Sequence, residues 1–251
     1  MSDRTPFVAG NWKMHKTGGE AKAFIDAVAP HVSGGDVEVA ICPPFTALAS
    51  AMHSARDTGV QVFAQNMHYE SEGAFTGEVA PPMLTAVGVA GSIVGHSERR
   101  ALFGETDRAL ALKVPAALEH GLIPILCVGE TEEERDAGDT ERKLRQQVRE
   151  DLARVDTERL SEVVIAYEPI WAVGTGRVAT QDQAQEALAF VRALVGDRSA
   201  EQAERIRLLY GGSVNSENAA ELLALPDVDG ALVGGASLQP ESFAAIVAAA
   251  R

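Results

Sequence analysis

The chain has 251 residues, of which 46% are hydrophobic, so it can bury a sizeable core in one large domain or two small ones. Its formal net charge of −14 argues against general binding to nucleic acids or anionic membranes, because both carry negative charge. No apolar run is long enough to span a bilayer, and the N-terminus lacks the basic-then-apolar pattern of a signal peptide.

Short β-branched or apolar runs alternate with longer amphipathic segments along the whole chain. The runs predict strands over Phe7–Gly10, Val37–Ile41, Val60–Ala64, Gly91–Val94, Ile123–Val128, Val163–Tyr167, Ile206–Tyr210 and Gly230–Val233. The amphipathic segments predict helices that include Glu20–Ala29, Thr46–Ala55, Asp107–His120, Gln181–Val195 and Pro240–Ala250. Eight strand–helix units without a linker-like change in composition favour one closed (β/α)₈ barrel, an α/β fold, over residues 1–251. A doubly wound open sheet is the alternative, because periodicity alone does not prove closure.

Two further features concern the compartment and the acidic residues. The only cysteines, Cys42 and Cys127, have no spacing typical of a disulfide or a zinc site, which favours a reducing, cytoplasmic location. The acidic run from Glu130 to Asp139 is interpreted as the solvated start of a helix.

The stretch from Val163 to Thr180 places an acid directly after a strand. Glu168 follows the apolar run, and Pro169 restricts the next backbone angle. Trp171 is expected to be exposed in the following segment, and Thr180 is expected to cap the next helix. An acid at a strand end followed by a flap with stiffer ends suggests a catalytic base and its lid. A turn or cap role is the alternative for Glu168.

The same stretch also contains a possible nucleotide-binding pattern. Gly174, Gly176 and Ala179 spell G-x-G-x-x-A between a strand and a helix, as in a dinucleotide fingerprint. That fingerprint requires its first glycine directly after the strand, whereas residues 168–173 intervene here. The pattern therefore weighs against a nicotinamide cofactor.

Unusual polar residues and glycines follow most of the predicted strands. The carboxyl ends of the strands are where barrel enzymes place their sites, so these residues are expected to meet there. They are Asn11 and Lys13, Gln65 and Asn66, His96, Glu168, Gly211–Ser213, and Gly234–Gly235.

Several of these groups suit the chemistry of a phosphate-bearing substrate. Glycines after the last two strands let backbone N–H groups approach an anion closely. Lys13 offers a compact positive charge for a phosphate or a developing oxyanion, and the amide of Asn11 can donate a hydrogen bond. His96 opens a helical turn, where the cation is disfavoured, so a neutral imidazole is expected to donate to a substrate oxygen.

Taken together, these motifs resemble the triosephosphate isomerase family, over about Phe7 to Ala248. The motifs that carry the resemblance are Asn11–His15, Gly95–Arg100, Ala166–Gly176 and Tyr210–Val214. The resemblance implies a single-domain TIM barrel that interconverts dihydroxyacetone phosphate and D-glyceraldehyde 3-phosphate in glycolysis, gluconeogenesis and the pentose shunt. It implies no metal and no cofactor. Another phosphate-binding barrel enzyme, and a non-catalytic binding barrel, are the competing functions.

The resemblance also implies the role of each site residue. Glu168 would move the proton between the two carbons, His96 would be the electrophile, and Asn11 and Lys13 would assist. Glu98 and Cys127 would support the site from behind. The residues that would bind substrate are Asn11, Trp12, Lys13, Gly174, Ser213, Gly234 and Gly235.

Two segments of the resemblance concern the lid and a partner subunit. The lid would run through Pro169, Ile170, Trp171, Ala172, Val173, Gly174, Thr175, Gly176, Arg177, Val178 and Ala179. The loop with Gly73, Phe75, Thr76, Gly77 and Glu78 would reach a second copy, which implies a homodimer. Arg177 and Val178 stand where the family often has Lys-Thr, and Met14 occupies an interface position that varies in the family.

Overall fold

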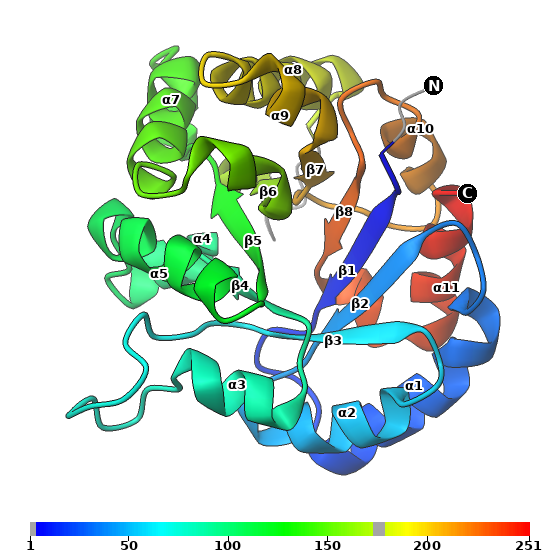
Figure 1. The fold of residues 1–251 in the computed structure, drawn as a ribbon. Coiled ribbons are helices and arrows are strands. Elements are labelled where there is room, and N and C mark those ends of the chain that lie inside the picture. The colour runs from blue at the N-terminus through cyan, green and yellow to red at the C-terminus, as the bar shows by residue number, and fades with distance from the viewer. Residues whose placement is uncertain (1–3, 173–178) are drawn as a thin grey trace.

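The computed structural model describes residues 4–172 and 179–251, in which eight parallel strands close into a barrel (Figure 1). The strands follow one another around the barrel in sequence order, and β1 pairs with β8 to complete the ring. They are β1 (Phe7–Asn11), β2 (Glu38–Cys42), β3 (Val60–Ala64), β4 (Gly91–Val94), β5 (Ile123–Val128), β6 (Val164–Tyr167), β7 (Arg207–Tyr210) and β8 (Gly230–Val233). The predicted (β/α)₈ barrel is confirmed, and the β1–β8 pairing excludes the open sheet.

Helices surround the barrel as an outer layer (Figure 1). The α-helices are α1 (Gly18–Val32), α2 (Leu48–Ala55), α3 (Pro81–Val87), α4 (Ser97–Leu102), α5 (Asp107–Glu119), α6 (Glu132–Asp136), α7 (Thr140–Asp151), α8 (Gln181–Gly196), α9 (Ala200–Arg205), α10 (Ala219–Leu223) and α11 (Pro240–Ala249). Short 3₁₀ helices are η1 (Phe45–Ala47), η2 (Thr157–Glu162), η3 (Ile170–Ala172) and η4 (Gly235–Leu238). In the described residues, no helix has the length and apolar character needed to cross a bilayer.

The start of α8 follows from its capping residues. The Oγ1 of Thr180 accepts a hydrogen bond from the backbone N–H of Gln183 at 3.2 Å, and the Gln183 side chain accepts one from the N–H of Thr180 at 3.0 Å. This reciprocal pair satisfies two N–H groups that a helix start leaves without partners. The prediction that Thr180 caps this helix is therefore confirmed.

The core has two layers separated by the strands. One layer fills the barrel interior, where the rings of Phe7 and Phe63 lie 5.6 Å apart between centroids. The larger layer lies between the barrel and the helices and includes Val8, Ile41 and Val62. Because both faces of each strand are buried, the strands have nearly continuous apolar sequences, which made them recognisable.

Two expectations about burial are wrong. Trp171 was expected to be exposed, but it is buried, and its indole N–H donates to Glu130 Oε1 at 2.9 Å. Glu130 heads the acidic run that was interpreted as solvated, yet it is completely buried. The hydroxyl of Tyr167 donates to the same oxygen at 3.0 Å, and Arg135 Nη1 lies 3.1 Å from it. Hydrogen bonds from β6 and η3 thus offset the cost of burying a carboxylate that the sequence pattern predicted to be exposed to solvent.

Candidate active site

The polar residues predicted to meet at the carboxyl ends of the strands do meet there. All of them except Gln65 and Asn66 line a cavity of about 340 Å³ at the mouth of the barrel. Gln65 and Asn66 line an adjacent groove, which shares Asn11, Lys13 and His96 with this cavity. The cavity's lining residues belong to the ends of β1, β4, β6, β7 and β8 or to the loops that follow these strands. The lining includes Asn11, Lys13, His96, Glu168, Gly211, Gly212, Ser213, Gly234 and Gly235.

Glu168 is held by donors from the start of α4. Its Oε2 accepts the backbone N–H of Ser97 at 2.9 Å, and its Oε1 lies 3.2 Å from Ser97 Oγ and 3.0 Å from His96 Nε2. The residue is only 2% exposed, and that burial raises the pKa of the carboxyl group. The electrostatic attraction and hydrogen bond of His96, together with the hydrogen bonds from Ser97, lower the pKa by more than burial raises it. The pKa of Glu168 therefore lies below its ordinary value.

The loop after β7 approaches Glu168 so closely that only glycine fits there. A Cβ on Gly211 would lie 2.9 Å from Glu168 Cγ and 3.1 Å from the carbonyl oxygen of Tyr167. Both contacts are shorter than ordinary packing allows. Gly211 therefore permits the carboxylate to lie directly against the loop that follows β7.

The hydrogen bonds of His96 favour one form of its ring. His96 precedes α4, and its Nδ1 accepts the backbone N–H of Glu98 at 3.3 Å. An Nδ1 that accepts carries no proton, so Nε2 carries the proton and can donate toward the cavity. Burial lowers the pKa of the ring, whereas the adjacent Glu168 carboxylate raises it, and the net effect is a raised pKa while the two side chains touch.

Lys13 has an unusual backbone that neighbouring side chains hold in place. Its φ is 53°, in the left-handed region, which costs a non-glycine residue about 1–2 kcal/mol. Its N–H donates to Asn11 Oδ1 at 3.0 Å, and its carbonyl oxygen accepts from Gln65 Nε2 at 2.8 Å. Each such bond contributes about 1 kcal/mol, so the pair offsets the cost. Its Nζ lies 2.5 Å from Glu98 Oε1.

Two predicted site residues lie behind the cavity rather than on it. The Trp12 side chain is fully buried, donates its indole N–H to the carbonyl oxygen of Ser237 at 3.1 Å and packs edge-on against Phe24. The structure does not bring this side chain to the cavity. Cys127 lies in the barrel interior, where burial, and next the charge of Glu168, raise the pKa of its thiol.

The glycine loops and part of the predicted lid border the same cavity. Ser213, Gly234 and Gly235 are among the cavity residues, and Ser213 Oγ donates to the carbonyl oxygen of Ala172 at 3.3 Å. In the lid, Pro169 and Ala179 are buried, and Ile170–Ala172 form η3. Val173, Gly174, Thr175, Gly176, Arg177 and Val178 lie outside the described residues.

Sequence reasoning gave no role to two residues that touch the site. Ser97 supplies two of the donors to Glu168, and Gln65 binds the backbone of Lys13. The place of Gln65 after β3 was noted, but nothing in a linear sequence shows which carbonyl it contacts. A serine at the first position of a helix was the available signal for Ser97, since N–H groups there are free to bind an anion.

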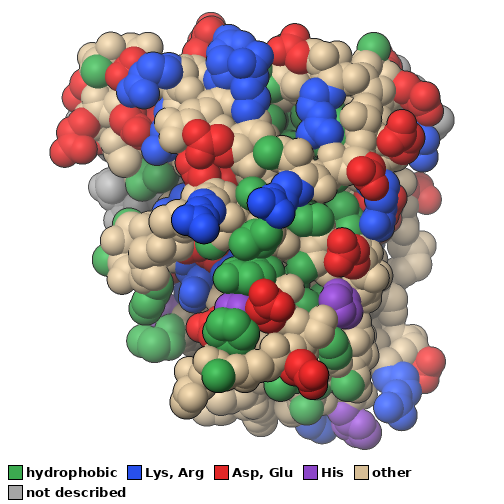
Figure 2. Space-filling view, turned by 60° about the vertical axis from the view of Figure 1, so that its left-hand side comes forward, with side chains coloured by type: hydrophobic (Ala, Val, Ile, Leu, Met, Phe, Trp, Pro, Cys, Tyr) green, Lys and Arg blue, Asp and Glu red, His purple; other side chains and the backbone are tan. Residues whose placement is uncertain are grey.

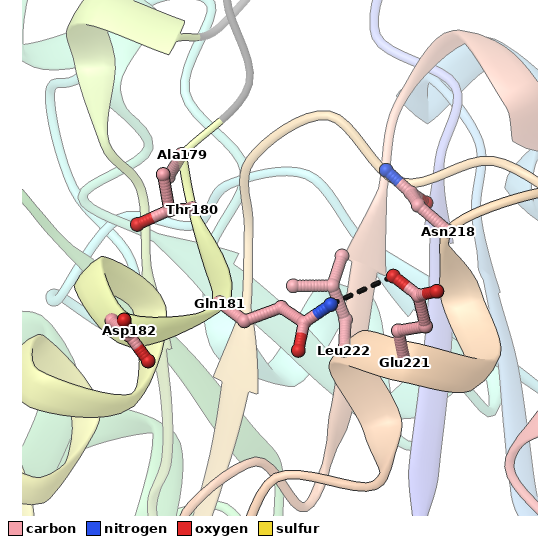
Figure 3. A pocket seen from close by; sticks show the side chains of 7 residues that line it. All are labelled: Ala179, Thr180, Gln181, Asp182, Asn218, Glu221 and Leu222. Carbon is pink, nitrogen blue, oxygen red and sulfur yellow. Dashed lines mark hydrogen bonds between the residues drawn. The ribbon is translucent and has the colours of Figure 1, made fainter.

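A second hollow, of about 430 Å³, lies between the start of α8 and α10 (Figure 3). Its lining residues are Ala179, Thr180, Gln181, Asp182, Asn218, Glu221 and Leu222. Across it, the side-chain amide of Gln181 donates to Glu221 at 2.7 Å, so these polar groups already satisfy each other (Figure 3). The cavity at the barrel mouth instead presents a base, a neutral donor and a cation together, which makes it the stronger candidate.

In the part of the chain that the structure describes, no group of three His, Cys, Asp or Glu side chains could hold a metal ion. The expectation of a reaction without metal or cofactor stays a prediction.

The fold and this cavity define a (β/α)₈-barrel enzyme. The triosephosphate isomerase family model matches residues 6–250. Similar proteins include the triosephosphate isomerase of Moorella thermoacetica, 51% identical over 97% of this chain and 98% of the relative. Those of Symbiobacterium thermophilum and Carboxydothermus hydrogenoformans are each 53% identical, over 98% and 97% of this chain and 97% and 98% of the relatives. The chain belongs to the triosephosphate isomerase family.

Proposed function

We propose that this protein interconverts dihydroxyacetone phosphate and D-glyceraldehyde 3-phosphate, a step of glycolysis, with Glu168 as the base. The observation that carries the assignment of the base is the position of Glu168. Its buried carboxylate lies at the barrel mouth, 3.0 Å from His96 Nε2, in a cavity that also contains Lys13. A base, an electrophile and a cation within one small cavity are what proton transfer beside a carbonyl requires.

The reaction moves one proton between neighbouring carbons. Glu168 takes a proton from C1 of dihydroxyacetone phosphate, and the electron pair left behind forms an enediolate. The carboxylic acid then returns a proton to C2, the proton of the C1 hydroxyl is transferred to the C2 oxygen, and C1 becomes the aldehyde. Nothing is oxidised or reduced overall, so the chemistry needs only a base and groups that stabilise negative oxygen.

His96 supplies that stabilisation as a neutral donor. With Nδ1 occupied by the N–H of Glu98, the N–H of Nε2 is the one available to the substrate oxygens. A neutral imidazole is a suitable electrophile here, and this family of enzymes is itself the established example of such a histidine beside a glutamate base and a closing loop. Asn11 assists, because its Oδ1 is used by the Lys13 N–H and its amide N–H₂ remains for the substrate.

The contacts of Glu168 suggest how its basicity changes during the reaction. Bound to Ser97 and His96, the carboxylate has a lowered pKa and is a weak base. To reach a carbon-bound proton it has to give up those donors to some extent. Burial then dominates and raises its pKa, so the base becomes stronger when substrate occupies the cavity.

The phosphate group would be held by charge and by backbone donors. Lys13 provides the positive charge, and Ser213, Gly234 and Gly235 provide close approach at the ends of β7 and β8. Gly174 would add a backbone N–H through the lid, in the segment outside the described residues. Glu98 and Cys127 would act from behind, by holding Lys13 and packing below Glu168.

We also propose that the chain functions as a homodimer. Met14 is 93% exposed, and Leu102 and Phe103 are 73% and 68% exposed near the cavity. Large apolar side chains in water mark a surface that binds another protein. On the face shown in Figure 2, hydrophobic side chains gather below a more highly charged upper part.

The loop between β3 and α3 is the proposed arm of the dimer. It projects from the body of the molecule (Figure 1), and its residues Gly73, Phe75, Thr76, Gly77 and Glu78 are all exposed. A groove of about 250 Å³, lined by Met14, Gln65 and Phe103 among others, lies beside the active-site residues. The loop of a second copy would fill such a groove.

Two coarser proposals complete the assignment. Both cysteines are buried and free, which supports a reducing cytoplasmic location. The single barrel and its surrounding helices support one catalytic domain over residues 1–251.

Proton NMR of dihydroxyacetone phosphate in D₂O tests the activity directly. With the purified protein, deuterium should enter the substrate carbon and the aldose should form. A control with the Glu168→Gln variant should show little of either signal. A spectrum of the wild-type mixture that stays unchanged would overturn the proposed function.

A further inference from the structure

The carbonyl oxygens that follow β1 and end β2 share one hydrogen-bond donor group. The Nε2 of Gln65 lies 2.8 Å from the carbonyl oxygen of Lys13 and 2.8 Å from that of Cys42. An amide nitrogen has two N–H groups, so each carbonyl receives one. Cys42 is the register partner of Asn11, the last residue of β1. Gln65, just after β3, therefore connects the ends of β1, β2 and β3 through hydrogen bonds at the barrel mouth.

We propose that Gln65 is a positioning residue for Lys13: by holding the Lys13 carbonyl, it keeps the strained backbone that directs the ammonium group into the cavity. The inference rests on the proposed role of Lys13 in binding phosphate. At φ 53° a lysine backbone relaxes readily to ordinary angles once its partners are lost. Such a rotation would redirect the whole side chain, including the Nζ that pairs with Glu98.

The contacts on the other side of Lys13 do not replace Gln65. The N–H of Lys13 donates to Asn11 Oδ1, which fixes the start of the turn but leaves its carbonyl free to rotate. Within the described residues, Gln65 is the side chain found on that carbonyl. Removal of its amide leaves the left-handed angle supported from one side only.

A misplaced Lys13 should weaken binding more than it slows chemistry. A phosphate contact is present in the substrate complex and in the transition state alike, so its loss raises KM and changes kcat less. Loss of a base or electrophile would lower kcat instead. The ratio of the two effects therefore distinguishes a positioning role from a catalytic one and from simple unfolding.

The test compares Gln65→Met with Gln61→Met. Both glutamines are half-buried and belong to or directly follow β3, but Gln61 interacts with Glu38 and not with the loop after β1. Gln65→Met should raise KM about tenfold, the loss of one to two hydrogen bonds, with a smaller change in kcat. Gln61→Met should leave both constants near wild type. Sedimentation at the assay concentration checks that association is the same in both variants.

A double-mutant cycle with Lys13→Met shows whether Gln65 acts through Lys13. If it does, Gln65→Met should add little to the KM of Lys13→Met, because the group to be positioned is already gone. An equal increase in both backgrounds overturns the inference, as does a Gln65→Met enzyme with wild-type KM. If Lys13→Met itself binds substrate normally, the proposed role of Lys13 fails first, and this inference fails with it.

Gln65→Glu provides a second readout that folding defects do not imitate. An ionised glutamate has no N–H or O–H to donate and faces two carbonyl oxygens, which raises its pKa. Its protonated form can donate one hydrogen bond. The KM ratio of variant to wild type should therefore fall as the assay pH is lowered from about 8 to about 6. A ratio that stays constant with pH overturns the positioning role.

Discussion

The two ends of the barrel bury charged side chains in different ways. Near the amino ends of the strands, Asp229 accepts hydrogen bonds from Arg4 at 2.6 Å, from Arg192 at 2.8 Å and from the backbone N–H of Leu208 at 2.9 Å. At the carboxyl ends, Glu168 is equally buried, but its partners are Ser97 and His96, the groups beside the proposed substrate. The partners of the first carboxylate lie outside the cavity, whereas the proposed reaction requires the second to exchange its partners.

This difference separates residues that stabilise the fold from residues that perform the chemistry. Removal of a permanent partner should cost stability and leave the rate unchanged. Removal of an exchangeable partner should cost rate and leave stability largely unchanged. The strained Lys13 belongs to the second group, since strain of this kind is tolerated where function requires it.

The largest effect is expected from Glu168→Gln, which keeps the shape of the side chain and removes the base. The value of kcat should fall by about 10²–10⁴-fold, because positioned acid–base groups contribute that much. Steady-state assays measure the loss, and circular dichroism should show an unchanged fold. A variant that retains near wild-type kcat would remove Glu168 from the mechanism.

Lys13→Met should have the next largest effect, on binding. The affinity for a phosphate-bearing inhibitor should fall by roughly 10²-fold, because a charge in a water-excluded site is worth far more than one in solvent. Calorimetric titration measures it. The matched control neutralises the exposed Glu133 and Glu201, whose fields are screened over a Debye length of about 8 Å. Equal losses in both proteins would contradict a local site.

Thr76→Arg tests whether the site at the carboxyl ends of the strands is complete within one chain. Placing a charge in the exposed loop should prevent that loop from burying itself against a second copy. We expect monomers whose activity is reduced more than about tenfold, if the loop braces Asn11 and Lys13 of its partner. Sedimentation and assay at the same concentration measure both properties. A fully active monomer would show that the site needs no partner.

Arg192→Met tests the ion-pair cluster near the amino ends of the strands. The guanidinium donates to Asp227, to Asp229 and to the carbonyl oxygens of Ala203 and Ile206, so its loss leaves several buried acceptors unpaired. The free energy of unfolding should fall by roughly 3 kcal/mol, with kcat of the folded enzyme unchanged. Urea denaturation measures the first and a standard assay the second. Lost activity in a folded variant would break the comparison between the two ends.

The smallest effect is a shift in pH dependence for Ser97→Ala. The folded protein lowers the pKa of Glu168, so its ionised, active form persists into acid, and kcat/KM should decline only there. Loss of the hydroxyl removes one hydrogen bond to the carboxylate, which raises the pKa and moves the acid limb to higher pH. The control is Ser92→Ala, because Ser92 is also a buried serine but lies on β4. A profile of Ser97→Ala identical to wild type would contradict the contact.

The sequence predicted the barrel and most of the cavity, because both depend on local patterns. Buried strands are apolar throughout, and residues such as Asn11, His96 and Glu168 follow directly at their ends. The buried state of Glu130 was missed, since its donors come from Tyr167 and Trp171, about forty positions away. The φ of Lys13 was missed because lysine gives no sign of a left-handed turn.

The same limit applies to Trp12. The resemblance to the family implied that Trp12 contacts the substrate. The pleat of β1 and the turn after it instead direct the indole toward Phe24 and Ser237, beneath the helices. Neighbours in the sequence at a strand end point to opposite sides, so adjacency alone does not place a side chain in a site.

The pairing of β1 with β8 has a consequence for how the chain is made. Phe7 aligns with Gly230, so the free edge of the first strand stays uncovered until the ribosome has released the eighth. Until then the nascent chain carries unpaired backbone groups at both edges of a growing sheet, a state that favours aggregation. Ring closure therefore comes after all the other strand pairings have become possible, and chaperones that shield sheet edges would matter most just before it.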